Sequence, residues 1–348
     1  METEKQGVVA WQSPSNIALV KYWGKHDNQL PNNTSISFTL SSAFTETSIV
    51  YQPKANDGTI AFSFLFEGKP KPSFNAKIQK FLESIQTKLP FLSQYHLEIN
   101  STNSFPHSTG IASSAASMSA LALCLLDIDY QIKDQEIDAD FWLKASELAR
   151  LGSGSACRSV FPNMAIWGKH QAIPNSSNEY AIPFTAMHSN FNEYQDAILI
   201  ISSEEKSVSS RAGHALMENN PFASVRYQQA QENMLKIMDA LESGNQGFFT
   251  EIVEAEALTL HALMMCSSPS FILLKPNTLK IIDLIKTFRQ KNNVSLCYTL
   301  DAGPNLHLLY PKKEARIIED WIEKEVKQYC EAGKVIYDSV GSGPKKIK

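Results

Sequence analysis

The chain has 348 residues, of which 43% are hydrophobic and 20% are charged. This composition is typical of a globular protein, and the length exceeds what one hydrophobic core usually serves, so we expect two domains. The formal net charge is −4 and no basic block interrupts the sequence, which argues against nucleic acid or a membrane surface as a partner. No uninterrupted apolar run approaches the roughly 18 residues of a membrane-spanning helix.

The cysteine pattern and the N-terminus predict a cytoplasmic protein. The first six residues are polar and show no hydrophobic signal segment. The cysteines are odd in number, far apart and without metal-ligand spacing, which favours reduced thiols: Cys124, Cys157, Cys266, Cys297 and Cys330. Cys157 lies within a Gly/Ser motif, where we expect a packed small side chain rather than a nucleophile.

In the first half of the chain, short strands are predicted at residues 8–11, 36–40, 47–51, 58–66 and 95–100. The turn Asn56-Asp57-Gly58 indicates a hairpin before the strand at 58–66. Helical apolar spacing occurs at residues 76–89 and 141–151. Residues 159–167 and 180–183 have an extended pattern.

The second half predicts a buried strand at 197–201, a strand pair at 296–300 and 306–310, and a last strand at 335–338. Helices are predicted at 221–241, 247–265, 278–292 and 315–330. Strands and helices mix without regular alternation, which indicates the α+β class. A polar segment at 188–195 places the boundary between domains 1–190 and 191–348.

Residues 101–120 run from a polar, proline-containing segment through Gly110 into alanines and serines, and then into an apolar helix. The first amides of a helix lack intrahelical acceptors and favour an anion. Gly110, Ala112, Ser113 and Ser114 would let phosphate oxygens approach the backbone. A small-residue helix packed tightly against a neighbour explains the same pattern equally well.

A lysine follows an apolar strand at position 21, and Tyr22 and Lys25 come shortly after it. Lys21 is either an edge residue with its ammonium in solvent or a cation directed into a cleft. Considered alone, the residue pattern favours the solvated lysine. In the second case, Tyr22 and Lys25 could hold a phosphate.

Two further segments offer anion-binding or acid–base groups. Residues 152–159 alternate glycine with serine and contain Arg158, whose planar guanidinium suits a carboxylate or phosphate; the alternative is a tight turn with a surface arginine, and we favour a functional role. Asp301 ends an apolar strand before a Gly-Pro turn, and it could act as a base toward a hydroxyl, although an ordinary turn aspartate fits better from the residues alone. The loop from Ser207 to Arg211 is a weaker candidate of the same kind.

Together these motifs resemble the diphosphomevalonate decarboxylases of the GHMP kinase superfamily. The matching segments are NIALVKYWGK at 16–25, GIASSAA at 110–116, GSGSACRS at 152–159 and DAGPN at 301–305. They occur in the family order and span nearly the whole chain, and HALMM at 261–265 is also similar to the family. The segment at 105–110 departs from the commoner Pro-Thr-Ala-Ala-Gly form but keeps its proline and glycine.

The resemblance implies a two-domain α+β fold of the GHMP-kinase type, with a ribosomal-protein-S5-like N-terminal domain, a ferredoxin-like C-terminal domain and the active site in the cleft between them. It implies ATP as co-substrate, Mg²⁺ as cofactor and a homodimer. The expected reaction converts mevalonate 5-diphosphate and ATP to isopentenyl diphosphate, ADP, phosphate and CO2, a step of isoprenoid biosynthesis.

The resemblance also assigns roles to residues of this sequence. The catalytic centre would contain Asp301, Lys21, Asn16 and Arg158, with Arg158 holding the substrate carboxylate. The nucleotide would contact Ser101, Asn103, Gly110, Ala112, Ser113 and Ser114, with the Ser113 hydroxyl near Mg²⁺. The substrate diphosphate would contact Tyr22, Lys25, Ser153, Gly154, Ser155, Ser210 and Arg211.

Three alternatives have the same fold. A mevalonate 3-kinase would stop at phosphorylation, and a decarboxylase of mevalonate 5-phosphate would need fewer diphosphate contacts. The presence of Lys21, Arg158 and Asp301 argues against the kinase. The presence of Tyr22, Lys25 and Arg211 favours the diphosphate. A non-catalytic ligand sensor would have lost residues of the reacting centre, and none is missing.

Overall fold

The computed structural model describes residues 5–105, 111, 113–204 and 210–348. Most of the first half of the chain forms one large sheet. Its strands are β1 Gly7–Val20, β4 Ser35–Pro53, β5 Ala61–Phe66, β6 Lys69–Pro70, β7 Tyr95–Asn103, β8 Met164–Trp167, β9 Ala181–Phe184 and β14 Lys345–Lys346. The main path runs β14-β1-β4-β7-β5-β6, and β8 pairs with both β4 and β9. A separate two-stranded hairpin comprises β2 Lys25–His26 and β3 Leu30–Pro31.

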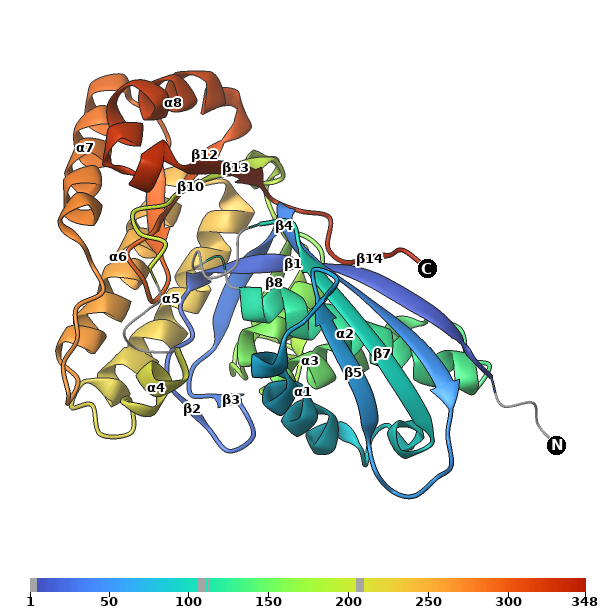
Figure 1. The fold of residues 1–348 in the computed structure, drawn as a ribbon. Helices are drawn as coiled ribbons and strands as arrows, with labels where there is room; N and C mark the ends of the chain where they lie inside the picture. Colours follow the sequence, from blue (N-terminus) through green and yellow to red (C-terminus); the bar gives the residue numbers. More distant parts are fainter. Residues whose placement is uncertain (1–4, 106–110, 112, 205–209) are drawn as a thin grey trace.

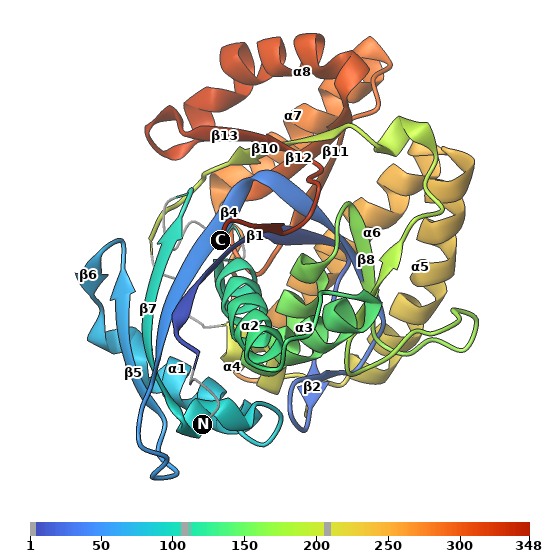
Figure 2. The ribbon, with the colours of Figure 1, turned by 90° about the vertical axis from the view of Figure 1, so that its right-hand side faces the viewer.

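Three helices accompany this sheet: α1 Pro72–Ile85, α2 Ser113–Ile132 and α3 Ala139–Gly152. Helix α2 packs against β1 and β4, and α3 packs against α2 (Figure 2). Helix α2 is rich in alanine and leucine and is buried on nearly all sides. Among the described residues it is the one helix long and apolar enough to span a membrane, but most of it lies inside the protein core, as expected for a central core helix.

The second half of the chain forms a four-stranded antiparallel sheet in the order β11-β12-β10-β13. The strands are β10 Tyr194–Leu199, β11 Cys297–Leu300, β12 Leu306–Pro311 and β13 Val335–Ser339. The helices are α4 Ser210–Ala215, α5 Ala223–Ser243, α6 Gln246–Met265, α7 Pro276–Asn292 and α8 Ala315–Trp321. Figure 1 shows this half on the left and the first sheet on the right. Helices α5 and α6 pack against β1, so β1 reaches from one half into the other.

The two halves are also joined at residues 41–43 of β4. The Asp338 carboxylate, on β13, accepts hydrogen bonds from the backbone N–H groups of Ser41, Ser42 and Ala43 at 2.7–2.9 Å. At the end of the chain, β14 adds to the edge of the first sheet beside β1. The division of the chain into domains 1–190 and 191–348 stays a prediction.

The α+β class is confirmed, and several predicted elements differ in pairing or extent. The strands at 36–40 and 47–51 are parts of one strand, β4. The predicted hairpin is wrong, because β5 pairs in parallel with β7 rather than with β4. Residues 154–160 form the 3-10 helix η2 (Gly154–Val160), so the extended segment begins only at β8. The predicted helix at 315–330 is α-helical as far as Trp321 and continues as π and 3-10 turns.

Candidate active site

The centre of the site is an ion pair between the two halves of the molecule. Lys21 lies one residue beyond β1, and Asp301 follows β11. The Lys21 ammonium is 3.0 Å from Asp301 Oδ1. The Lys21 side chain is only 2% exposed, whereas that of Asp301 is 30% exposed. The solvated lysine favoured by the residues alone is therefore wrong. Asp301 is not an ordinary turn aspartate, because it pairs with a buried lysine while its own carboxylate stays accessible to a ligand.

The charge of Lys21 depends on its neighbours. Burial lowers the pKa of the Lys21 ammonium, because the charged form loses its hydration, and Asp301 and Glu256 oppose this effect. On α6, His261 Nε2 donates a hydrogen bond to the Asp301 carbonyl at 3.1 Å. The turn that carries Asp301 is thus held by a residue of the HALMM segment.

Arg158 and Asn16 form a second buried group beside this pair, and each is 2% exposed. Arg158 Nε donates to Asn16 Oδ1 at 3.3 Å, and Asn16 Nδ2 donates to Ser159 Oγ at 2.8 Å. The Arg158 guanidinium also donates to the hydroxyls of Ser35 and Ser37, at 2.6 and 2.8 Å. Strand β4 therefore orients the predicted carboxylate-binding arginine through two serine hydroxyls.

Arg158 carries a buried positive charge. Within the described part of the chain, no carboxylate lies within ion-pair distance of its guanidinium. Burial lowers the pKa of Arg158, and nearby groups including Asp301 only partly offset that effect. A buried cation without a partner is energetically costly. A ligand carboxylate bound here would provide the missing negative charge.

The Gly/Ser segment lies beside Tyr22. The Tyr22 ring packs against Trp167 and His214, with centroid distances of 4.7 and 4.4 Å. A Cβ atom at Gly154 would lie 2.8 Å from Tyr22 Oη, so this position needs glycine for the close approach. The backbone carbonyl of Ser155 accepts a hydrogen bond from Asn16 Nδ2 at 3.1 Å. The structure therefore brings the predicted diphosphate segment next to the predicted catalytic residues.

The start of α2 lies beside the same segment. Ser114 Oγ is 3.0 Å from Ser153 Oγ, which joins the predicted nucleotide and diphosphate residues. Ser113 is half-buried and Ser114 is exposed at the first turn of a 20-residue helix, where free amides and the helix dipole favour an anion. Gly110 and Ala112 lie outside the described residues.

The remaining predicted residues are more dispersed. The Ser101 and Asn103 side chains, on β7, bond to Thr47 and Thr45 of β4 at 3.0 and 2.8 Å. The Lys25 ammonium donates to Gln29 Oε1 at 2.6 Å. Ser210 and Arg211 belong to α4, and their side chains lie outside the described part of the structure.

The residues fit a phosphate-bound magnesium ion better than a metal cage made of protein. Over the described ranges, no group of three or more His, Cys, Asp or Glu side chains could hold a metal ion. The hydroxyls of Ser113 and Ser114 lie instead at a phosphate-favouring helix end. Mg²⁺ commonly binds few protein ligands and is completed by substrate phosphates and water.

Cys157 is a packing residue, as the sequence predicts. Its side chain is fully buried, and its thiol donates a hydrogen bond to the Gly154 carbonyl at 3.0 Å. Burial raises the pKa of the Cys157 thiol to about 12. It therefore stays protonated at neutral pH and does not act as a nucleophile.

Sequence reasoning missed two charged residues that contact Lys21. Arg226 on α5 and Glu256 on α6 are 2% and 0% exposed, and both bond to the Lys21 backbone. Neither belongs to a motif. Their only signal was a charged residue on the apolar face of a predicted helix, and that signal does not identify a partner in a distant strand.

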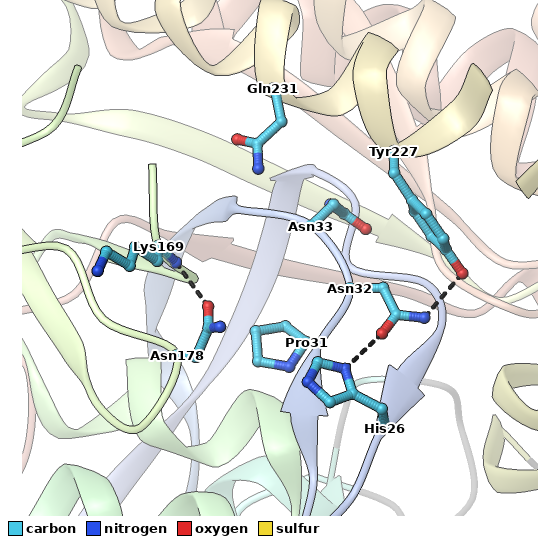
Figure 3. Close-up of a pocket in the computed structure, with 8 residues that line it drawn as sticks. All are labelled: His26, Pro31, Asn32, Asn33, Lys169, Asn178, Tyr227 and Gln231. Atoms are coloured by element: carbon cyan, nitrogen blue, oxygen red, sulfur yellow. Dashed lines mark hydrogen bonds between the residues drawn. The ribbon is translucent and has the colours of Figure 1, made fainter. Parts of the chain in front are cut away.

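A separate cavity of about 490 Å³ lies beside the β2–β3 hairpin (Figure 3). Polar side chains line it from the β2–β3 hairpin, from the loop between β8 and β9, and from α5, including His26, Lys169, Asn178 and Gln231. None of the predicted catalytic residues lines this cavity. Asn33 at its wall donates through Nδ2 to the Lys21 carbonyl at 2.9 Å, so the cavity adjoins the backbone of the Lys21 segment.

Comparison with known proteins agrees with this geometry. The family model described as the diphosphomevalonate decarboxylase-like N-terminal domain matches residues 13–180, and that of the mevalonate 5-diphosphate decarboxylase C-terminal domain matches residues 197–340. The diphosphomevalonate decarboxylase of Gibberella zeae is 31% identical over 88% of this chain and 81% of that protein. The corresponding enzyme of Aspergillus fumigatus is 30% identical over 89% of this chain and 78% of that protein.

Solved structures have the same fold over the whole chain. Mevalonate diphosphate decarboxylase from Staphylococcus aureus superimposes with a TM-score of 0.84 at 28% identity and covers 100% of both chains. A structure of MDDEF in complex with MVAPP, AMPPCP and magnesium gives a TM-score of 0.83 at 26% identity, over 99% of this chain and 100% of that one. From the two matched family models and the aligned relatives, this chain belongs to the diphosphomevalonate decarboxylase family.

Proposed function

We propose that this protein catalyses the ATP-dependent decarboxylation of mevalonate 5-diphosphate to isopentenyl diphosphate, with release of ADP, phosphate and CO2. The observation that carries the proposal is the juxtaposition of the Lys21–Asp301 ion pair with Arg158, a buried cation without a close carboxylate among the described residues. Family relatives are diphosphomevalonate decarboxylases, and a structural neighbour was solved with MVAPP, AMPPCP and magnesium.

The first chemical step is phosphorylation of the 3-hydroxyl group. The hydroxyl oxygen bonds to the γ-phosphorus of ATP, the bond to the β-phosphate oxygen breaks, and ADP leaves. Asp301 orients the hydroxyl or accepts its proton, and the Lys21 ammonium neutralises charge beside it. Such transfers depend mainly on positioning and electrostatic stabilisation. When bound, Mg²⁺ neutralises phosphate charge, and Ser113 is the residue we assign to its vicinity.

The second step forms the alkene. The bond between C3 and the phosphate oxygen breaks, and the departing phosphate takes any proton that Asp301 accepted in the first step. Positive charge develops on the tertiary carbon, where the Asp301 carboxylate stabilises it. The bond between C2 and the carboxyl carbon then breaks, its electron pair forms the double bond, and CO2 leaves. Arg158 aligns the substrate carboxylate, and its own guanidinium is held by hydrogen bonds to Asn16, Ser35 and Ser37. The main contribution of Arg158 is alignment, because binding the carboxylate anion more tightly than the transition state would slow the loss of CO2.

We assign the diphosphate to Tyr22, Lys25 and the segment 153–155, together with Ser210 and Arg211. What supports this assignment is the close packing of Gly154 against Tyr22 and the contact between Ser153 and Ser114. We assign the ATP phosphates to the start of α2, with Ser101, Asn103, Gly110 and Ala112 as further nucleotide positions. The helix N-terminus supplies amides for those oxygens.

The protein is further proposed to be a cytoplasmic homodimer without nucleic acid or membrane partners. The net charge of −4 without a basic block supports the absence of polyanionic partners. The five free cysteines suit a reducing compartment. Analytical ultracentrifugation of the purified chain tests the dimer, and a single monomeric species would reject it.

A single-turnover experiment tests the reaction. The enzyme is mixed with ATP, Mg²⁺ and mevalonate 5-diphosphate labelled in its carboxyl group, and ADP and labelled CO2 are counted. Equal amounts of both products support the proposal. ADP without CO2 would indicate a 3-kinase, and neither product would indicate a ligand sensor or another substrate. An equal rate with mevalonate 5-phosphate would overturn the substrate assignment.

A further inference from the structure

Two charged residues of the second half of the molecule hold the backbone at Lys21. Glu256 Oε2 accepts a hydrogen bond from the Lys21 N–H at 2.8 Å. Arg226 Nη2 donates to the Lys21 carbonyl at 3.0 Å. Lys21 lies just beyond the end of β1. Side chains of α5 and α6, rather than a neighbouring strand, therefore bond to its backbone N–H and carbonyl. Asn33 contributes a further hydrogen bond to the same carbonyl.

Arg226 and Glu256 form a buried ion pair of their own. Their two side chains are 1% and 0% exposed and meet in a two-pronged contact. Asn233 Nδ2 donates to Glu256 Oε1 at 2.7 Å, and Arg226 Nη1 donates to Gln229 Oε1 at 2.9 Å. Burying two charges costs free energy that an apolar pair would not cost. The arrangement therefore calls for an explanation other than stability.

We infer that the Arg226–Glu256 pair is a positioning device for the proposed reaction: it fixes the backbone of Lys21 so that the ammonium meets Asp301 and the reacting hydroxyl. This inference rests on the proposed function. Neither residue touches the reacting atoms, and both act through Lys21. The pair lies on α5 and α6, whereas Lys21 directly follows β1 of the first sheet, so the device also sets how the two halves meet at the site.

Glu256 of this pair also acts on the charge of Lys21. The groups facing its ammonium from the surrounding elements are Asp301 after β11, Glu256 on α6 and Arg158 on η2. Glu256 raises the pKa of Lys21, and burial and Arg158 lower it. Arg226 and His261 face the Lys21 carbonyl and the Asp301 carbonyl respectively. Loss of the Glu256 charge must therefore lower the pKa of Lys21 further.

The test compares Glu256→Gln with Glu254→Gln. Glu254 lies on the same helix and pairs with Arg289 at 2.6 Å, and among the described residues it makes no hydrogen bond to the Lys21 segment. We expect Glu256→Gln to reduce kcat roughly tenfold to a hundredfold, with substrate Kd unchanged, because small misplacements of a catalytic group have effects of this size. Glu254→Gln should keep the parent kcat.

The second readout does not depend on turnover. Lysine labelled with ¹³C at Cε allows the pKa of Lys21 to be measured by NMR, with its resonance assigned from the Lys21→Arg variant. Glu256→Gln should lower that pKa by roughly one pH unit, and Glu254→Gln should leave it unchanged. If the unmodified enzyme releases no CO2, the proposed function fails, but this titration still tests the positioning device.

A double variant guards against misfolding of Glu256→Gln. Arg226→Met with Glu256→Leu replaces the pair by apolar side chains, an exchange that is often neutral for stability. We expect this protein to fold with a parental melting temperature and yet to have the reduced kcat and the lowered Lys21 pKa. A parental kcat and a parental Lys21 pKa in the double variant would overturn the inference.

Discussion

At the scale of single residues, the site depends on the carboxylate of Asp301, which pairs with the Lys21 ammonium. Asp301→Asn keeps the shape of the side chain and removes its charge. We expect kcat to fall on the order of a hundredfold to a thousandfold, because the hydroxyl and the developing cation lose their carboxylate. Substrate Kd, measured by calorimetry, should change little. An active Asp301→Asn enzyme would remove Asp301 from its assigned role.

Arg158 offers a second test at this scale. Its guanidinium holds three fixed hydrogen bonds to Asn16, Ser35 and Ser37, and a lysine ammonium cannot reproduce that planar fork. We expect Arg158→Lys to reduce kcat/KM for mevalonate 5-diphosphate roughly tenfold to a hundredfold, the equivalent of one charge-assisted contact. Steady-state kinetics measure the change.

The control for this variant is Arg289→Lys, because the Arg289 guanidinium bonds to Glu254 and to the Leu296 carbonyl, and neither belongs to the predicted site. That protein should keep the parental kcat/KM. If Arg158→Lys also had normal kinetics, the substrate carboxylate would have to be held by another group.

At the scale of elements, the close packing of η2 against Tyr22 can be tested with one methyl group. A Cβ at Gly154 would approach Tyr22 Oη and the Trp167 ring to 2.8 Å each. Gly154→Ala must therefore displace the Tyr22 ring or the Gly/Ser segment. We expect KM for mevalonate 5-diphosphate to rise about tenfold, a loss equivalent to one hydrogen bond to the diphosphate. Steady-state kinetics at saturating ATP measure it.

The matched control is Gly247→Ala in α6, where the new methyl group would meet its nearest neighbour at 3.6 Å, an ordinary contact distance. This variant should have the parental KM. An unchanged KM in Gly154→Ala would show that the Tyr22 side of the segment does not contact the diphosphate.

Local patterns predicted most elements of this fold, because the spacing of apolar residues within one segment is enough to indicate a helix or a strand. Which strands pair with each other was harder to predict from the sequence. The residues Asn56–Gly58 are typical of a hairpin turn, which would pair β4 with β5. Instead β7, about 30 residues later in the chain, lies between these two strands. Partners of that kind depend on the whole sheet, and a short window does not contain them.

The site shows the same division. The motifs identified Lys21, Arg158 and Asp301 as candidates, but the residues alone favoured a solvated lysine and a turn aspartate. Only the approach of the two halves brings Lys21 Nζ to 3.0 Å from Asp301. Arg226 and Glu256 were missed because their function lies in contacts with a backbone more than 200 residues away in the chain.

At the scale of the whole molecule, the two halves meet around a buried histidine. His214 on α4 packs against the rings of Tyr22 and Trp23, and its Nδ1 accepts a hydrogen bond from the Gly24 N–H at 3.0 Å. Burial, with a smaller effect from Lys25, lowers the pKa of His214 to about 3. The folded protein therefore keeps this imidazole neutral throughout the physiological range.

This burial predicts a loss of stability in mild acid. The unfolded chain binds a proton at His214 with a pKa of about 6.5, whereas the folded protein does so only near pH 3. Stability from this residue is therefore complete above pH 6.5 and is lost as the pH falls toward 3. Between pH 7 and pH 5 the loss amounts to about 2 kcal/mol. Urea unfolding at both pH values should show this decrease, and His214→Asn should lessen it by about that amount.

The control is His26→Asn, which changes an exposed histidine and should keep the parental decrease. An equal decrease in all three proteins would show that His214 takes up its proton without unfolding.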